Sequence, residues 1–113
     1  MLTTNQQIFL YRKPVDLRKS FDALASLVNY QLQENPLSGA FFIFLNKSAN
    51  RIKILYWDQD GFAIWMKRLE RGVFPVPINL NEDKISIDRI AFHALLDGVK
   101  IIKKTRRFEL KKL

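Results

Sequence analysis

The sequence contains no cysteine, and His93 is its only histidine. The absence of thiols excludes disulfides, thiolate metal sites and a cysteine nucleophile, and it is typical of a reducing cytoplasm. The four glycines are scattered at positions 39, 61, 72 and 98, so no glycine-rich loop is present to cradle a phosphate. No serine stands in a GxSxG context, and a lone histidine between Phe92 and Ala94 favours a packed structural residue over a general base.

Acidic residues that could hold a metal are also sparse. Asp58 and Asp60 flank a turn, where aspartate is favoured for backbone reasons alone. A two-metal site for phosphoryl transfer needs further ligands, and Glu70 stands ten residues beyond Asp60, with no evident way to meet the pair. We therefore predict no metal site, no cofactor and no catalytic residue, and hence a protein that is not an enzyme.

Long hydrophobic runs are missing too. The longest apolar run, residues 40–45, has six members, whereas a membrane-spanning helix needs about 20. The first residues, MLTTNQQIFLYRK, lack the charged region followed by an apolar region that marks a secretory signal. We expect a cytoplasmic protein with no membrane partner.

What the chain does have is a core-forming composition and an uneven charge. Hydrophobic residues make up 48% of its 113 residues, which predicts one packed domain that folds without staples. Of the net charge of +8, residues 100–113 carry +6, from seven lysines and arginines and one glutamate. We therefore predict a globular domain over residues 1–99 and a basic tail over 100–113. The tail is either a solvated end or, because dense like charges repel, an arm for a polyanion.

The first part of the chain predicts a strand, a helix and a second strand. Residues 7–12 (QIFLYR) form a short apolar run that Pro14 ends. The nearly all-apolar residues 40–46 predict a strand that is covered on both faces or central in the sheet. Between them, Asp16 is a candidate helix N-cap, followed by apolar residues at helical spacing, namely Leu17, Phe21, Leu24, Val28 and Leu32.

Residues 51–72 (RIKILYWDQDGFAIWMKRLERG) predict two amphipathic strands joined by a tight turn. Charged and apolar residues alternate from Arg51 to Ile54, and Asp60-Gly61 supplies the positive-φ dipeptide that two-residue hairpin turns prefer. With residues 40–46, this gives an antiparallel meander. The returning strand should place Phe62, Ile64 and Met66 on one face and Ala63, Trp65 and Lys67 on the other.

A second, shorter helix follows, with Ser86 as its predicted N-cap, Asp88 in its first turn and Gly98 as its stop. The predicted fold class is therefore α+β. It comprises a small antiparallel meander of three to four strands packed by one helix from the N-terminal half, a second short helix and the basic C-terminal tail.

Basic and aromatic side chains gather on and beyond the hairpin, and cations interleaved with aromatic rings suit phosphate and base contacts. Trp57 and Trp65 flank the turn and would form one stacking surface if they face the same way; the alternative is packing within the sheet. The alternative for the cations at the strand end is a solvated edge that guards against aggregation. The candidate nucleic-acid-binding residues are Lys67, Arg68 and Arg71 near the hairpin, and Lys103, Lys104, Arg106 and Arg107 in the tail.

Three segments of the chain carry a resemblance to a known family. Residues 52–72, with the core LYWDQDGFAIWMKRLERG, resemble the TnpB accessory proteins of the IS66 group of bacterial insertion sequences, the second-open-reading-frame-like family. Residues 15–28 (VDLRKSFDALASLV) are similar to the early helix motif of that family, which includes Arg18 and Lys19. Residues 36–44 are similar to the start of its next strand. Gln59 and Ser20 stand where the family commonly has glycine, and Val73 and Val76 where it usually has a basic residue and a second tryptophan.

The resemblance implies a role in the transposition of an insertion sequence. In that family the strand-transfer chemistry belongs to a separate, larger transposase, so the implied role is that of a non-catalytic accessory protein. Two hypotheses follow: the protein binds nucleic acid, DNA in the first place, through its basic residues, or it docks on the partner transposase without touching DNA. A homodimer through the free edge of the small sheet stays open.

Overall fold

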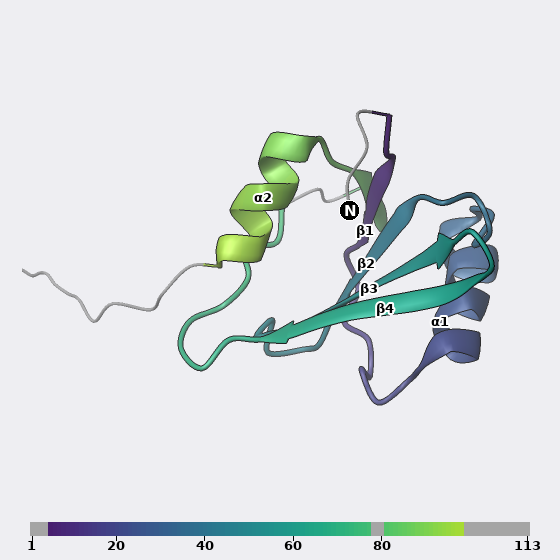
Figure 1. Cartoon of the computed structure of the whole chain (residues 1–113). Coiled ribbons are helices and arrows are strands. Elements are labelled where there is room, and N and C mark those ends of the chain that lie inside the picture. The colour runs from purple at the N-terminus through teal and green to yellow at the C-terminus, as the bar shows by residue number, and fades with distance from the viewer. Residues whose placement is uncertain (1–4, 78–80, 99–113) are drawn as a thin grey trace, which may run out of the picture.

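The computed structural model describes residues 5–77 and 81–98 and confirms the α+β class. A sheet lies between two helical layers, with α1 on one side and α2 on the other (Figure 1). The elements in chain order are β1 (Ile8–Tyr11), α1 (Phe21–Leu27), the π-helical turn η1 (Val28–Leu32), β2 (Phe41–Leu45), β3 (Arg51–Asp58), β4 (Gly61–Arg68), β5 (Lys84–Ser86) and α2 (Arg89–Asp97).

Within the described residues, the sheet is mixed and has five strands in the order β4-β3-β2-β1-β5. The meander β2-β3-β4 is antiparallel, as predicted, and β5 pairs antiparallel with β1. The sheet differs from the expectation in two details: it has slightly more than the three to four strands predicted, and one of its pairings is parallel. The connection through α1 and η1 returns the chain to the starting end of the sheet, so β2 runs parallel to β1. β5 has only three residues, which is too short to show an alternating pattern.

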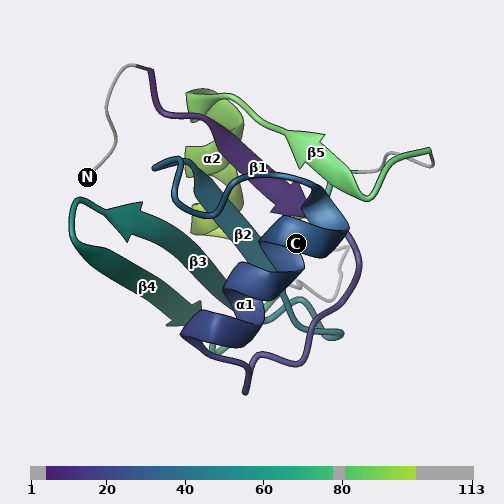
Figure 2. The ribbon, with the colours of Figure 1, turned by 90° about the vertical axis from the view of Figure 1, so that its right-hand side faces the viewer.

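β2 is buried on both faces of the sheet, which explains its unbroken apolar sequence. Phe42 and Phe44 point into the cluster under α1, together with Leu24 and Val28 of the helices. The alternate residues of the strand, Phe41, Ile43 and Leu45, point into the cluster under α2. The view in Figure 2 shows α1 in front of the sheet and α2 behind it. The expectation of a strand covered on both faces is therefore confirmed.

Both helices begin later than the sequence predicted. Asp16 is not the N-cap of α1, because its carboxylate accepts hydrogen bonds from the backbone and guanidinium of Arg18 and closes a turn ahead of the helix. The N-cap position of α1 is Ser20, which makes no side-chain capping bond. The polar residue expected to start α1 is therefore used in a turn ahead of the helix.

For α2, the predicted N-cap Ser86 is instead the last residue of β5, paired with Phe9. Asp88 is the N-cap, and its side chain accepts a hydrogen bond of 2.8 Å from the backbone N–H of Ala91. Gly98, with φ of 73°, ends the helix as predicted, and its N–H donates to the carbonyl of Leu95.

Candidate nucleic-acid interface

The β3–β4 hairpin positions most of the candidate residues. Its ladder runs without interruption from the pair Arg51–Arg68 to the pair Asp58–Gly61. The loop therefore has two residues, as predicted, but they are Gln59 and Asp60. The positive φ of 60° belongs to Gln59, and Gly61 is already the first residue of β4, so the turn lies one residue earlier than the Asp60-Gly61 prediction. This explains why a glycine would suit position 59.

The two tryptophans lie on opposite faces of the sheet, so they do not form one stacking surface. Trp57 pairs across the ladder with Phe62, and their rings meet edge to face with centroids 5.1 Å apart, on the side of α1. Trp65 lies opposite Ile54 and packs against the core under α2. Because the ladder closes with the pair Asp58–Gly61, the β4 residues on the same face as Trp57 are the even-numbered ones. Trp65 therefore lies on the opposite face. Each ring is half-buried, and a stacking role for either one stays a prediction.

Lys67 has a contact within the fold. Its Nζ donates a hydrogen bond of 2.9 Å to the carbonyl of Leu96, in the last turn of α2. The last carbonyls of a helix lack intrahelical donors and form the negative end of the helix dipole. Lys67 therefore fastens the end of α2 to the edge strand β4, whatever else it does.

The next two cations are exposed. Arg68 lies 3.1 Å from Glu70 in an ion pair whose partners are 58% and 80% exposed, so the pair contributes little to stability. Arg71 is exposed and has no ion-pair partner within residues 5–77 and 81–98. Lys103, Lys104, Arg106 and Arg107 lie outside the described residues, as does the rest of the predicted tail.

The structure adds two cations that the sequence interpretation missed. Arg51 is the cross-strand partner of Arg68, so two positive side chains stand directly opposite each other on the α1 side of the sheet. Lys47, in the loop before β3, is exposed and, like Arg51, forms no ion pair with any described residue. The position of the hairpin loop could have revealed Arg51 from the sequence, because a two-residue turn at 59–60 places position 51 opposite position 68. We refer to Lys47, Arg51, Arg68 and Arg71 as the β4-edge cations.

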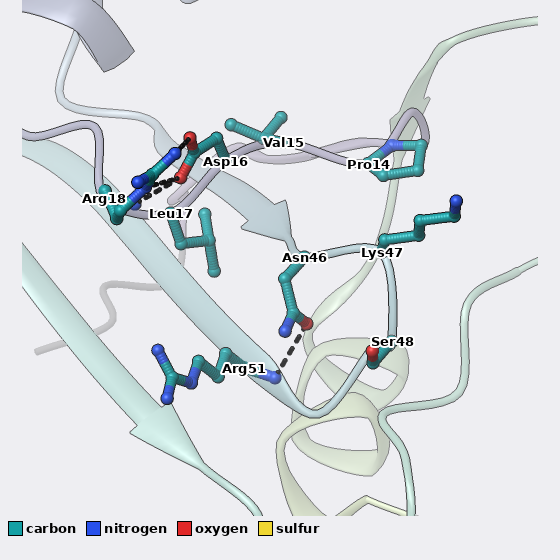
Figure 3. Close-up of a pocket in the computed structure, with 9 residues that line it drawn as sticks. All are labelled: Pro14, Val15, Asp16, Leu17, Arg18, Asn46, Lys47, Ser48 and Arg51. Carbon is teal, nitrogen blue, oxygen red and sulfur yellow. Dashed lines mark hydrogen bonds and ion pairs between the residues drawn. The ribbon is translucent and has the colours of Figure 1, made fainter.

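A hollow of about 500 Å³ opens beside Arg51 and Lys47 (Figure 3). One wall is the segment before α1 and the other is the loop between β2 and β3. Its lining comprises Pro14, Val15, Asp16, Leu17, Arg18, Asn46, Lys47, Ser48 and Arg51. The lining residues thus include three cations and one acid, a net formal charge of +2.

The acid in this hollow is already matched. The Arg18 guanidinium donates to Asp16 through Nε, at 3.0 and 3.1 Å, and through Nη2, at 2.6 Å. These bonds hold the pKa of the Asp16 carboxyl well below its usual range, and Asp16 in turn raises the pKa of Arg18. Asp16 therefore stays ionised but paired, and it leaves Lys47 and Arg51 without a counter-charge.

The other residues considered in the sequence, Asp58, Asp60 and His93, do not line this hollow. Over residues 5–77 and 81–98, no group of three or more His, Cys, Asp or Glu lies together in a way that could hold a metal ion. Asp58 and Asp60 are exposed at the tip of the hairpin, and His93 is exposed on α2 with its ring 5.7 Å from that of Phe92. No helix among the described residues is long and apolar enough to cross a membrane.

Comparison with known proteins identifies the family. The family model described as IS66 Orf2 like protein matches residues 6–106. The uncharacterized protein y4jC of Sinorhizobium fredii (strain NBRC 101917 / NGR234) is 35% identical over 71 residues, which cover 63% of this chain and 61% of that relative. The uncharacterized protein y4hO of the same strain is 32% identical over 95 residues, which cover 84% of this chain and 82% of the relative.

The chain thus spans 61% of the length of y4jC and 82% of y4hO. No solved structure matches the chain. The family match includes every helix and strand described above and the whole β3–β4 hairpin. The chain therefore belongs to the IS66 Orf2-like family.

Proposed function

We propose that this protein is a non-catalytic accessory factor in the transposition of an IS66-type insertion sequence, and that it binds DNA through basic residues. Membership of the family suggests the accessory role in transposition. Direct DNA contact is our extension of that role. The observation that carries it is the Arg51–Arg68 pair, because two like charges held opposite each other on a rigid ladder favour an anion from outside.

The other cations of the fold support this choice by contrast. On the far edge of the sheet, Arg12 and Lys13 both form ion pairs with Asp83, and Lys84 pairs with Glu34. The β4-edge cations have one acidic partner among the described residues, Glu70. The tail residues Lys103, Lys104, Arg106 and Arg107 would add charge to whichever surface they reach, and Lys67 adds charge on the opposite face of β4.

The test is a titration of the purified protein against a duplex of the element's terminal repeat and against a scrambled duplex, at several salt concentrations. Four to six phosphate contacts predict a slope of log K against log salt of roughly −4 to −5. Preference for the repeat would add base readout to the phosphate contacts. Absence of binding to either duplex at low salt would refute direct DNA contact.

A second candidate function, docking on the partner transposase, is favoured by a different surface. An apolar hollow of about 220 Å³ lies between α2 and the segment after β4, lined by Pro75, Val76, Pro77, Ile87, Ala91, Ala94 and Leu95. On the same helix Ile90 is 81% exposed. Exposed apolar patches of this kind often mark protein contacts.

Co-purification with the transposase in high salt, after nuclease treatment, separates docking from DNA bridging. On the docking hypothesis the complex survives in the wild type and is lost in Ile90→Asp, while DNA binding by Ile90→Asp is unchanged. If nuclease treatment alone abolished the complex, DNA would be what joins the two proteins.

We also propose that the free edge of the sheet, at β4, forms a homodimer. The sheet order leaves the outer side of β4 without a strand partner among the described residues, and Met66 on this strand is 62% exposed. Sedimentation of the purified protein distinguishes the two states, and a monomer mass at high protein concentration would dismiss the dimer.

A further inference from the structure

We propose that the hollow beside Arg51 holds one phosphodiester group of a DNA strand, with Arg51 and Lys47 as its charged ligands and Arg18 as a positioned neighbour. This inference rests on the proposed DNA binding and names a place for it. No residue of the hollow was among the sites predicted from the sequence. The charge, the rigidity and the size of the hollow support this inference.

The charge of the hollow favours one anionic group. Arg18 and Asp16 neutralise each other, so Lys47 and Arg51 supply the remaining +2. A second source of positive potential is Arg68, directly across the ladder from Arg51. A bound phosphodiester would lower the repulsion between these two arginines as well as match the hollow's own charge.

The walls of the hollow are fixed by hydrogen bonds within the fold. The backbone N–H of Val15 donates to the carbonyl of Leu45 at 2.8 Å, which joins the segment before α1 to the end of β2. In the facing loop, the side-chain oxygen of Asn46 accepts from the N–H of Arg51 (Figure 3) and also from the N–H of Asn50. A site built on such a rigid frame loses little entropy when a ligand binds.

The same loop is also held by hydrogen bonds from the segment after β4. The backbone N–H groups of Leu69 and Phe74 donate to the carbonyls of Asn50 and Ala49, at 2.8 and 2.7 Å. The segment that carries Arg71 therefore crosses next to the loop that carries Lys47. These contacts bring cations from three separate stretches of the chain to one end of the hairpin.

The chemistry of the ligand follows from the residue types. A guanidinium presents a planar fork of N–H donors that matches two phosphate oxygens, and an ammonium adds a compact charge. Arg18 is oriented by Asp16 through Nε and Nη2, so its remaining nitrogen, Nη1, is available to a ligand. At about 500 Å³ the hollow has room for a phosphate together with the sugars on either side of it, which favours a strand backbone over an isolated ion.

The test measures the salt dependence of DNA binding by the full chain and by the double variant Lys47→Gln/Arg51→Gln. Loss of two phosphate contacts predicts a slope shallower by about 1.8, and about a tenfold or larger loss of affinity at 0.1 M salt. The control is Arg89→Gln, which removes one positive charge on α2 and should change the slope little. Both replaced side chains of the double variant are exposed, so its thermal midpoint should match the wild type.

A second measurement separates the sources of phosphate. In amide NMR spectra, a short DNA duplex should shift the backbone signals of Ser48 and Arg51 at concentrations where inorganic phosphate does not. Equal shifts with inorganic phosphate would make the hollow a general anion site and would overturn the assignment to DNA. If the double variant had the salt slope of the wild type, the hollow would not be a phosphodiester site, although the protein would still bind DNA. If the wild type did not bind DNA at all, both proposals would be refuted.

Discussion

The two edges of the sheet carry similar numbers of cations but differ in how many of these cations have acidic partners. On the β5 edge, Arg12 and Lys13 share Asp83, and Lys84 contacts Glu34 and also lies 5.3 Å from the centre of the Phe9 ring. On the β4 edge, Arg51 faces Arg68, and neither Lys47 nor Arg71 has an acidic partner among the described residues. Net charge alone cannot separate these regions. The positions of the acids decide which cations are left for a ligand.

The largest expected effect comes from reversing charge on the β4 edge. Arg51→Glu/Arg71→Glu should weaken DNA binding by about two orders of magnitude at 0.1 M salt, because it removes two phosphate contacts and adds repulsion. The control is Lys13→Glu/Arg89→Glu, which makes the same change in net charge at two residues that do not line the hollow. We expect it to weaken binding severalfold at most. Equal losses in a fluorescence anisotropy titration would mean that net charge, and not the β4 edge, governs binding.

A smaller effect tests the structural role of Lys67. Lys67→Met keeps the apolar stem but removes the donor to the carbonyl of Leu96, and we expect a loss of about 1 kcal/mol in the free energy of unfolding. The control is Arg68→Met, whose exposed ion pair should contribute less than about 0.5 kcal/mol. Urea unfolding measures both.

The same pair of variants sharpens the comparison of the edges. Because Lys67 is engaged with α2, Lys67→Met should reduce DNA affinity less than Arg68→Met does. The reverse order would restore Lys67 as a principal phosphate ligand, as the sequence predicted.

The hairpin that carries the β4 edge also contains a strained residue. Gln59 has φ of 60°, a region that disfavours residues with a Cβ. Gln59→Gly should relieve this strain, offset in part by the greater freedom of glycine in the unfolded chain, for a net gain of about 0.5 kcal/mol. Gln33, at φ of 55° after η1, offers a matched site away from the hairpin. A lower thermal midpoint for Gln59→Gly would contradict the turn geometry described above.

Much of the fold was readable from the sequence where pattern and burial agree. The strand alternation predicted the hairpin, its two-residue loop and the faces of β4, and the unbroken apolar run predicted a doubly covered β2. Helix starts were misplaced because Asp16 and Ser86 are good caps whose side chain or backbone is used elsewhere. The parallel pairing of β1 with β2 depends on where a connection leads, which no local pattern states.

The candidate site was less readable, for a related reason. Arg18, Lys47 and Arg51 are separated in sequence and line the same hollow because of the Val15–Leu45 hydrogen bond and the turn before β3. The tryptophans looked like a pair from their distance to the turn, but the ladder register places them on opposite faces. Composition located the charge of the chain, and only tertiary contacts show which cations are neutralised.

The smallest expected effect tests the comparison most directly, because it changes one acid on each edge. Glu70→Gln removes the carboxylate beside Arg68, and Asp83→Asn removes the carboxylate shared by Arg12 and Lys13. Both changes raise the net charge by one. On the present proposal, Glu70→Gln raises DNA affinity a few fold and steepens the salt slope by up to about 0.9, since Arg68 becomes available for one more phosphate.

Asp83→Asn, in contrast, should leave the salt slope unchanged although it unpairs two cations, because neither Arg12 nor Lys13 is among the residues that line the proposed phosphate site. Its effect should appear in stability, as a loss of less than about 1 kcal/mol from two partly exposed ion pairs. If Asp83→Asn steepened the slope as much as Glu70→Gln, DNA would have to approach both edges. The β4 edge would then be one part of a continuous basic surface and not the site itself.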